Sequence, residues 1–154
     1  MPSIVSTIVE VIVFRIERDV PEFLLLRRSD HDALYPGMWQ ILTGSVHAAE
    51  TGNNAAVREL REETGLSAER FWVVPHVGAF YDHQQDAVHL TPFFAAQVRA
   101  GIDPTLSTEH SAHAWLPFRD ALGLLAWPSQ REGVSLVHDV ILRGEAGSRL
   151  ARVW

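Results

Sequence analysis

The sequence predicts an α/β fold in which helices pack against a mixed β-sheet. The first observation is a pair of β-branched or leucine-rich runs, residues 4–14 and 22–27, separated by the polar turn ERDVP. The second is a helical pattern over residues 52–64, and the third is a return to strand-like runs at 71–82 and 87–98. Strands on both sides of a helix in one short chain indicate a single sheet with helices on it.

The helix over 52–64 has recognisable ends. Thr51 precedes it and can accept a hydrogen bond from its first turn, and Gly65 follows it in the position that commonly ends a helix. Before the helix, the stretch MWQILTGSV (38–46) predicts a short strand that leads into the turn HAAE (47–50). The helix is therefore expected to follow a strand and a tight turn directly.

The remaining stretches are assigned by the same patterns. The predicted elements are a loop at 29–37, a short strand at 113–117, helices at 117–125 and 129–143, and a loose tail at 144–154. The resulting order is β-β-β-α-β-β-β-α-α. With 154 residues, the chain is expected to form one domain, residues 1–154.

Charge and composition exclude several classes of function. A formal net charge of -6 provides no positive field to hold duplex nucleic acid. Cysteine is absent, which removes disulfides and thiolate metal sites and is compatible with the reducing cytoplasm, where we expect the protein to work. The apolar start of the chain contains Glu10 and is too short to span a bilayer, so no membrane partner is expected. The oligomeric state is left open, with a homodimer as one candidate.

Four glutamates, Glu50, Glu59, Glu62 and Glu63, lie in and just before the helix over 52–64. At about 100° per residue, the last three fall within an arc of roughly 100°. One interpretation is a solvated acidic face in which Arg58 and Glu62 pair at i,i+4. The other is a metal site, because both arginines of the helix are expected to point away from the acidic arc and flanking glycines let backbone carbonyls approach. Such oxygen ligands suit Mg²⁺ or Mn²⁺.

Residues 44–66 resemble the Nudix box, which reads Gly, five residues, Glu, seven residues, Arg-Glu-aliphatic, one residue, Glu-Glu, one residue, Gly-aliphatic. The matching positions are Gly44, Glu50, Arg58, Glu59, Leu60, Glu62, Glu63, Gly65 and Leu66. The resemblance implies a Nudix-type α/β/α sandwich. It also implies an enzyme that hydrolyses a nucleoside diphosphate linked to another group.

The resemblance assigns a role to the matching residues. Mg²⁺ (or Mn²⁺) would be held by the carboxylates of Glu59, Glu62 and Glu63 and by the carbonyl of Gly44. In similar enzymes, the arginine at the position of Arg58 pairs with the glutamate at the position of Glu50 and orients the loop and the helix. The general base comes either from the box, where Glu59 and Glu62 are candidates, or from a later loop.

The later loop LSTEHSAHAWLP offers Glu109 as a general base or an additional metal ligand. The alternative is that Glu109 only caps the short strand that follows it. The neighbouring His110 and His113 are expected to be polar surface residues.

Substrate recognition requires aromatic surfaces for a base and cations for phosphate. Trp39, Tyr81 and Trp127 are candidates for stacking on the base, with a place in the core as the alternative for each. Arg27 and Arg28 stand at the end of a strand and are candidates for binding phosphate, with an exposed strand end as the alternative.

Two further stretches resemble bacterial dihydroneopterin triphosphate pyrophosphatases, in which Trp-Gln precedes Thr-Gly-Ser-Val and Thr-Glu-His leads to Trp-Leu. Diadenosine tetraphosphate hydrolases usually carry Pro-Lys-Gly-His before the box, where this chain has Leu-Thr-Gly-Ser at residues 42–45. The turn HAAE departs from the Pro-Gly or Glu-Gly often seen at that place. The expected function is therefore a Mg²⁺-dependent pyrophosphohydrolase of a nucleoside or pterin triphosphate. A dinucleoside polyphosphate hydrolase and a non-catalytic nucleotide-sensing module are the alternatives.

Overall fold

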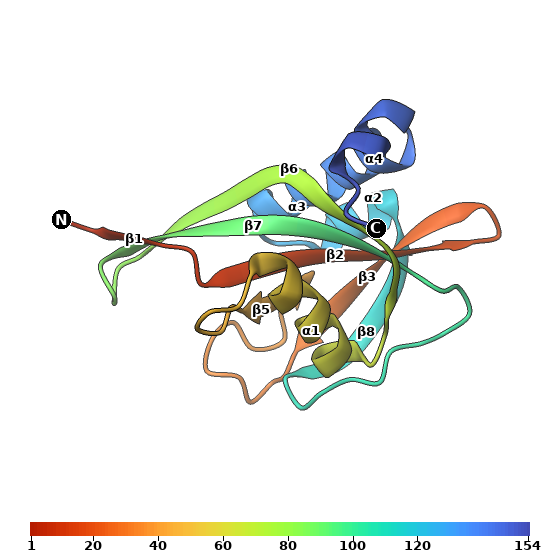
Figure 1. Ribbon diagram of the computed structural model, residues 1–154. Helices are drawn as coiled ribbons and strands as arrows, with labels where there is room; N and C mark the ends of the chain where they lie inside the picture. The colour runs from red at the N-terminus through yellow and green to blue at the C-terminus, as the bar shows by residue number, and fades with distance from the viewer.

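The computed structural model describes residues 1–154, except for the side chains of Glu145 and Leu150. A mixed sheet forms its centre, with strands in the order β1-β7-β2-β3-β4, and β5, β6 and β8 pair with β2, β7 and β3 (Figure 1). The strands are β1 (Ser3–Val5), β2 (Ile8–Glu17), β3 (Val20–Arg28), β4 (Trp39–Gln40), β5 (Leu42–Ser45), β6 (Ala68–Asp82), β7 (Ala87–Val98) and β8 (His110–Pro117).

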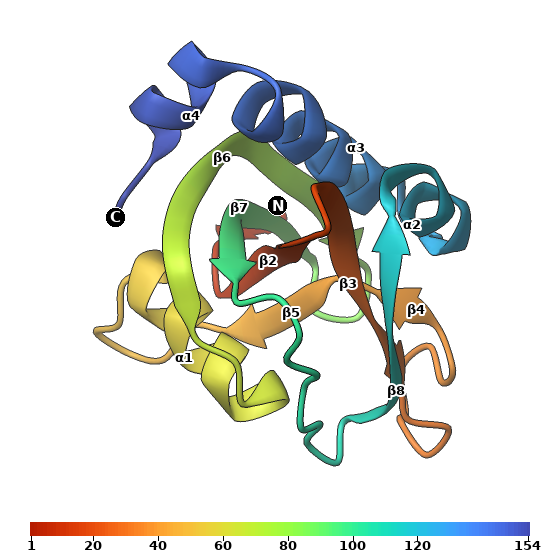
Figure 2. The same ribbon diagram turned by 90° about the vertical axis from the view of Figure 1, so that its right-hand side faces the viewer.

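Helices cover both faces of the sheet. They are α1 (Gly52–Thr64), α2 (Phe118–Leu124), α3 (Pro128–Leu136), the π-helical turn η1 (Val137–Leu142) and α4 (Glu145–Ala151). Figure 2 shows α1 on one side of the strands and α2, α3 and α4 on the other. The predicted α/β sandwich with a mixed sheet is thus confirmed.

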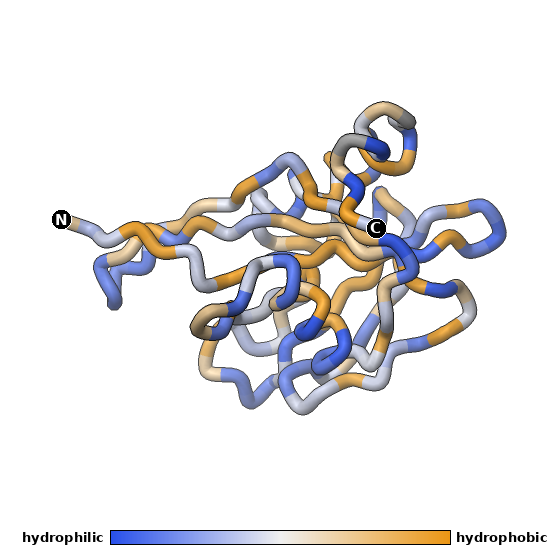
Figure 3. The backbone as a smooth tube through the Cα atoms, viewed as in Figure 1, coloured by the Kyte–Doolittle hydropathy of each residue, from blue (hydrophilic) through white to orange (hydrophobic). Residues whose placement is uncertain are grey.

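The two faces of β2 explain why two layers of helices are needed. Val9, Val11 and Val13 belong to the core beneath α1, whereas Ile12 and Phe14 belong to the core beneath α3. Successive side chains of a strand point to opposite faces, so a central strand that is apolar on both faces needs a cover on each side. Figure 3 shows hydrophobic residues concentrated along these central strands and hydrophilic residues in the turns.

The strand β2 also changes partner along its length. Its first half pairs with β5, where Val9 faces Gly44 and Glu10 faces Thr43, and its second half pairs with β3, where Phe14 faces Phe23. Its other edge runs parallel to β7. The start of the acidic helix is therefore anchored to the middle of the sheet through β5.

Several element boundaries differ from those predicted. The helix over 52–64 and the strand over 87–98 form as predicted, but the run at 4–14 divides into β1 and β2. The strand expected over 38–46 divides into β4, which pairs with β3, and β5, which pairs with β2. Between them, the backbone N–H of Ile41 leaves the sheet ladder and lies 3.4 Å from the side-chain oxygen of Gln130. The predicted helix over 129–143 divides into α3 and η1.

The prediction of a loose tail is wrong. The helix α4 occupies most of residues 144–154, and the chain then returns to the edge of β6. The backbone N–H of Phe71 donates to the carbonyl of Trp154 at 2.9 Å, and the two rings stack with centroids 4.7 Å apart. An aromatic last residue and a free strand edge hold the end of the chain, which its polar composition alone did not indicate.

Among the described residues, no helix is both long and apolar enough to cross a membrane.

Candidate active site

The acidic helix α1 forms where its sequence signals place it. Thr51 caps the first turn by accepting a hydrogen bond from the N–H of Asn54 at 3.3 Å, and Gly65 ends the helix with a φ of 68°. Its buried face carries alanine, leucine and threonine side chains together with Glu59 and Glu63. Two of the three clustered carboxylates therefore lie on the side of the helix that faces the sheet.

Glycine at position 44 makes room for Glu59. A Cβ atom at Gly44 would overlap the Cγ and carboxyl carbon of Glu59. The Oε1 atom of Glu59 accepts a hydrogen bond from the N–H of Ser45 at 3.0 Å, which ties the helix to the end of β5. The glycine of the box is thus required here by a close approach between strand and helix.

Arg58 lies at the centre of the site, and the expectation that it points away from the acidic arc is wrong. Its Nε and Nη2 donate to the two oxygens of Glu50, each at 2.9 Å. Its Nη1 donates to Glu59 at 3.0 Å and to Glu62 at 2.9 Å, and Nη2 also reaches the carbonyl of Ser45 at 2.7 Å. A planar guanidinium with five donors can serve all these acceptors at once.

This network shifts the pKa values of its members in opposite directions. The hydrogen bonds from Arg58 and from the N–H of His47 hold the pKa of Glu50 at about 2. Hydrogen bonds to Glu50, Glu59 and Glu62 raise the pKa of Arg58, so its charge is permanent. The pairing of Arg58 with Glu50, expected from the resemblance, is seen directly.

Glu63 is held by a second network near the C-terminal end of the same helix. Ser107 Oγ donates to Glu63 Oε2, and His110 Nδ1 lies 3.2 Å from the same oxygen. The other ring nitrogen of His110 lies 3.4 Å from Gln40 Nε2. A neutral ring that donates from Nδ1 and accepts at Nε2 satisfies both contacts. Burial raises the pKa of Glu63 and lowers the pKa of His110, which favours that neutral ring.

The prediction that His110 is a surface residue is therefore wrong. Its side chain is 2% exposed, because the start of β8 brings it under the loop that packs on the end of α1. His113, by contrast, lies partly exposed on β8, 3.9 Å from Asp103. Sequence reasoning also missed Ser107 and Gln40. One indication of these partners was present in the sequence, where the residues next to Glu109 are mostly polar.

Glu109 is exposed at the end of this loop, next to the acidic helix. Its backbone carbonyl accepts from the N–H of Ser29 at 2.9 Å, and its own N–H points at Ser107 Oγ at 3.3 Å. Partial burial, followed by the nearby charge of Glu63, raises the pKa of its carboxyl group. Its backbone therefore braces the strand start, while its carboxylate remains near the box.

The oxygen atoms of α1 and the Gly44 carbonyl suit a divalent cation, but the three glutamate side chains of α1 point in different directions. Glu59, Glu62, Glu63 and the carbonyl of Gly44 supply only hard oxygen atoms. Among the described residues, however, no three His, Asp or Glu side chains are arranged to share one ion. The reason is visible in the contacts: Arg58 holds Glu62 outward, and Ser107 holds Glu63.

The two candidate arginines organise the loop after β3. Arg27 donates to Asp30 at 2.8 Å and to Ser111 at 2.9 Å. Arg28 donates to Asp32 at 2.6 Å and to the carbonyl of Leu34 at 2.7 Å. Both guanidinium groups are thus occupied by protein partners, and a role in phosphate binding would require them to exchange those partners.

The three candidate aromatic residues are not brought together. Trp39 packs against the core beneath α3. Tyr81 lies at the end of the β6–β7 hairpin, where its hydroxyl donates to Asp86 at 3.0 Å, beside β1 (Figure 1). Trp127 stands at the start of α3, 37% exposed, with its ring edge to face with Tyr35. Trp127 alone of the three combines exposure with an aromatic neighbour.

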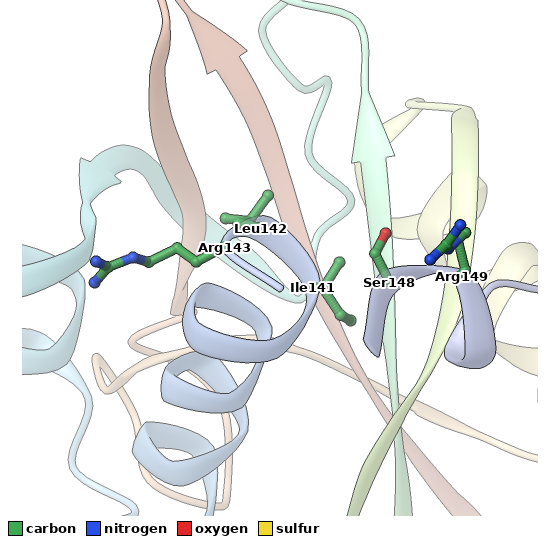
Figure 4. Close-up of a pocket in the computed structure, with 5 residues that line it drawn as sticks. All are labelled: Ile141, Leu142, Arg143, Ser148 and Arg149. Atoms are coloured by element: carbon green, nitrogen blue, oxygen red, sulfur yellow. The ribbon is translucent and has the colours of Figure 1, made fainter. Parts of the chain in front are cut away.

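Two surface hollows accompany the helices. One, with a volume of about 490 Å³, lies on the outer side of α1 and is lined by Glu50, Asn54, Val57, Arg58, Arg61, Glu62 and Trp154. The other, about 280 Å³, lies between η1 and α4 and is lined by Ile141, Leu142, Arg143, Ser148 and Arg149 (Figure 4). Only the first includes residues of the box.

Comparison with known proteins agrees with this geometry. Residues 7–137 match the family model of the NUDIX domain. This match covers most of the chain. The protein belongs to the NUDIX family, whose hydrolases act on nucleotide-like substrates and generally use divalent metals. The resemblance seen in the sequence is thereby confirmed.

Two curated relatives share the domain. An octanoyltransferase from Myxococcus xanthus is 36% identical over 118 residues, which cover 72% of this chain and 30% of that protein. The nucleoside triphosphatase NudI from Klebsiella pneumoniae is 26% identical over 105 residues, which cover 64% of this chain and 74% of that protein. The chain therefore spans less than a third of the first relative and about three quarters of the second.

Solved structures share the fold. An Ap4A hydrolase from C. elegans, solved as a binary complex, superposes with a TM-score of 0.74 at 20% identity, over 90% of this chain and 99% of that one. The dihydroneopterin triphosphate pyrophosphohydrolase from E. coli gives 0.67 at 22% identity, over 85% and 95%.

Proposed function

We propose that the protein is a Mg²⁺-dependent pyrophosphohydrolase that converts a nucleoside or pterin triphosphate to the monophosphate and pyrophosphate. The observation that carries this proposal is the position of Glu59 and Glu63 on the buried face of α1, with Glu59 lying over Gly44. The relation to a nucleoside triphosphatase supports a triphosphate substrate. The absence of cysteine supports a place in the cytoplasm.

Glu59, Glu62, Glu63 and the carbonyl of Gly44 would hold the metal. A bound Mg²⁺ or Mn²⁺ neutralises phosphate oxygens and lowers the pKa of a bound water. Glu62 is 55% exposed, so it can leave Arg58 and turn toward the other two carboxylates without disturbing the core. Arg58 would keep its bidentate contact with Glu50 and hold the turn before the helix in position.

Glu109 is the proposed general base. Its carboxylate lies near the acidic helix but has no side-chain hydrogen-bond partner among the described residues. It is therefore available to take a proton from the attacking water onto a carboxylate oxygen. Its raised pKa makes it a better proton acceptor than an ordinary exposed glutamate, provided that the pH keeps it ionised.

A screen of substrates tests the proposal. The protein is incubated with nucleoside triphosphates, dihydroneopterin triphosphate, dinucleoside polyphosphates and sugar nucleotides, each with Mg²⁺ and with Mn²⁺, and both products are identified by ³¹P NMR. The proposal predicts a monophosphate and pyrophosphate from a triphosphate. Release of orthophosphate from a triphosphate, or preferential cleavage of a dinucleoside polyphosphate, would show that it is wrong.

A further inference from the structure

Three aromatic rings form a stack that ends at the surface beside α1. Phe71 of β6 stacks with Phe94 of β7, with ring centroids 5.5 Å apart, and with Trp154, with centroids 4.7 Å apart. Phe71 and Phe94 are buried, whereas Trp154 is 45% exposed. Among the described residues, the arginine that lies over a tryptophan ring is Arg15, over Trp115, so no guanidinium covers Trp154. The outer ring of the stack is therefore open.

The hollow of about 490 Å³ on the outer side of α1 reaches this open ring. Trp154 lines it together with Asn54, Val57 and Arg61 of the helix. These three positions are spaced i, i+3 and i+7, so they share one face of α1. The buried carboxylates of the box lie on the face of α1 that packs toward the sheet. The hollow is thus a separate place on the same helix.

The lining of the hollow combines apolar surface with unused hydrogen-bonding groups. Val57 packs against the core beneath α1 and supplies an aliphatic surface. Asn54 and Arg61 hydrogen-bond through their backbones to Thr51 and Gly65, and among the described residues neither side chain has a partner. Small-molecule sites commonly combine apolar walls with a few polar groups in a volume of about 300–1,000 Å³. The hollow has the size and composition of such a site.

The charges of the lining side chains cancel. Glu50 and Glu62 are negative, and Arg58 and Arg61 are positive. Arg58 is already paired with both glutamates, at 2.9 Å each. A ligand is therefore selected less by its net charge than by a flat ring that fits against Trp154 and by acceptors that face the donors of Arg61.

We infer that this hollow is a second ligand site, which binds a planar aromatic heterocycle with hydrogen-bond acceptors, the chemical class of the nucleobases. The ring of the ligand lies on the open face of Trp154 and extends the stack of Phe71 and Phe94. Arg61 donates to acceptors on the edge of the ring, and Val57 contacts its apolar atoms. The site goes beyond the proposed function, because binding there requires neither metal nor hydrolysis.

Direct binding to the metal-free protein tests the inference. Adenosine, caffeine and ribose 5-phosphate are titrated separately into ¹⁵N-labelled protein, and ¹H–¹⁵N NMR follows the indole N–H signal of Trp154 and the amide signals of residues 54–61. The first two probes are flat heterocycles with acceptors, and the third is an anion without an aromatic ring. We expect the heterocycles to shift these signals saturably and to bind about tenfold or more tightly than ribose 5-phosphate, the range that stacking of a base on an aromatic side chain provides.

Two variants and a control complete the experiment. Trp154→Leu removes the ring but keeps an apolar side chain, and it should weaken adenosine binding at the hollow by about tenfold. Arg61→Gln removes the guanidinium from an exposed position and should weaken it by about threefold or more. Phe80→Leu, which removes an exposed aromatic ring from β6 outside the hollow, is the matched control and should bind like the wild type. Thermal melts confirm folding, and if Trp154→Leu is unfolded, Arg61→Gln carries the test.

The outcomes separate this inference from the proposed function. Equal binding of ribose 5-phosphate, the absence of saturable shifts at residues 54–61 and Trp154, or unchanged affinity in the folded variants overturns the second site. Hydrolysis of triphosphates by a protein that fails this binding test leaves the proposed function in place. Binding of heterocycles at the hollow by a protein that cleaves no triphosphate keeps the second site and removes the proposed function.

Discussion

The two faces of the sheet each hold a glutamate side chain in place, but with opposite kinds of partner. On the α1 side, Arg58 grips Glu50 with two parallel hydrogen bonds, and the pKa of Glu50 falls to about 2. On the α3 side, the neutral amide of Gln130 meets Glu10, and burial raises the pKa of Glu10 to about 7. The first arrangement fixes a charge permanently, which suits a structural brace. The second leaves a carboxyl group whose ionisation near neutral pH is sensitive to its burial.

The largest effect is expected from the metal-binding carboxylates of the α1 side. Glu62→Gln and Glu63→Gln should each lower kcat by about 10²-fold or more, equivalent to about 2.7 kcal/mol, because a lost charge leaves the metal and the transition state unbalanced. Steady-state kinetics at saturating Mg²⁺ measure this, and thermal melts should show folded proteins. Near-normal turnover by both variants would mean that these residues do not hold the metal.

Glu109→Gln should lower kcat by roughly 10²-fold and leave KM little changed. Since the base acts in its ionised form, wild-type kcat should fall as the pH drops below the raised pKa of Glu109, and the variant should lack that decrease. A pH–rate profile of both proteins measures this. Partial rescue at high Mn²⁺ would indicate a metal ligand instead, and wild-type behaviour throughout would leave Glu109 with its role in bracing the strand.

Glu10→Gln should change the pH dependence of stability. Burial raises the pKa of Glu10 in the folded state to about 7, above the ordinary glutamate value of 4.5, so the folded state binds more protons than the unfolded state between these pH values. The free energy of unfolding of the wild type should therefore decrease by about 2–3 kcal/mol from pH 4.5 to 7, and this component should be missing in the variant. Urea titrations at several pH values measure it. If the free energy of unfolding depends on pH in the same way in the variant and in the wild type, a group other than Glu10 causes the dependence.

Glu50 should give the opposite pH dependence of the free energy of unfolding in the same urea titrations. Its pKa is lowered to about 2, so its contribution to stability is present above pH 4.5 and is lost as the pH falls toward 2.

Arg58→Ala and Glu50→Ala should be strongly non-additive, since either change removes the same bidentate pair. A double-mutant cycle on unfolding free energy decides this. Additive losses would contradict the contact between the two side chains.

The smallest effect concerns the turn before the helix. Ala49 has a φ of 64°, in the left-handed region that favours glycine. Ala49→Gly should raise the free energy of unfolding by roughly 0.5 kcal/mol, because relief of the backbone exceeds the added entropy of the unfolded chain. Urea denaturation measures this as a higher midpoint in the variant, with the m-value unchanged between the two proteins. A lower midpoint would show that alanine is not strained here.

Local signals made the acidic helix predictable. Thr51, Gly65 and the spacing of the glutamates act within a few residues, so the limits of α1 and the closeness of Gly44 to the helix followed from the chain itself. The absence of glycine from the turn HAAE was also visible in advance, and Ala49 with its positive φ is the structural counterpart.

Contacts between distant segments were not predictable in this way. His110 is buried because β8 pairs with β3 and carries it to Glu63, 47 residues earlier in the chain. The division of β4 from β5 depends on Gln130, and the order in the tail depends on the edge of β6. The five acceptor contacts of Arg58 exceed the single i,i+4 pair that helical spacing suggests, because the turn before α1 folds back on the helix.

The most direct test of the α1 site is Mn²⁺ binding followed by electron paramagnetic resonance in three proteins: wild type, Glu63→Gln and the control Glu17→Gln. The site described here predicts that wild type and control bind Mn²⁺ alike and that Glu63→Gln binds about tenfold or more weakly, since one hard oxygen charge is lost from the donor set. If all three proteins titrate alike, the carboxylates of α1 do not hold the ion.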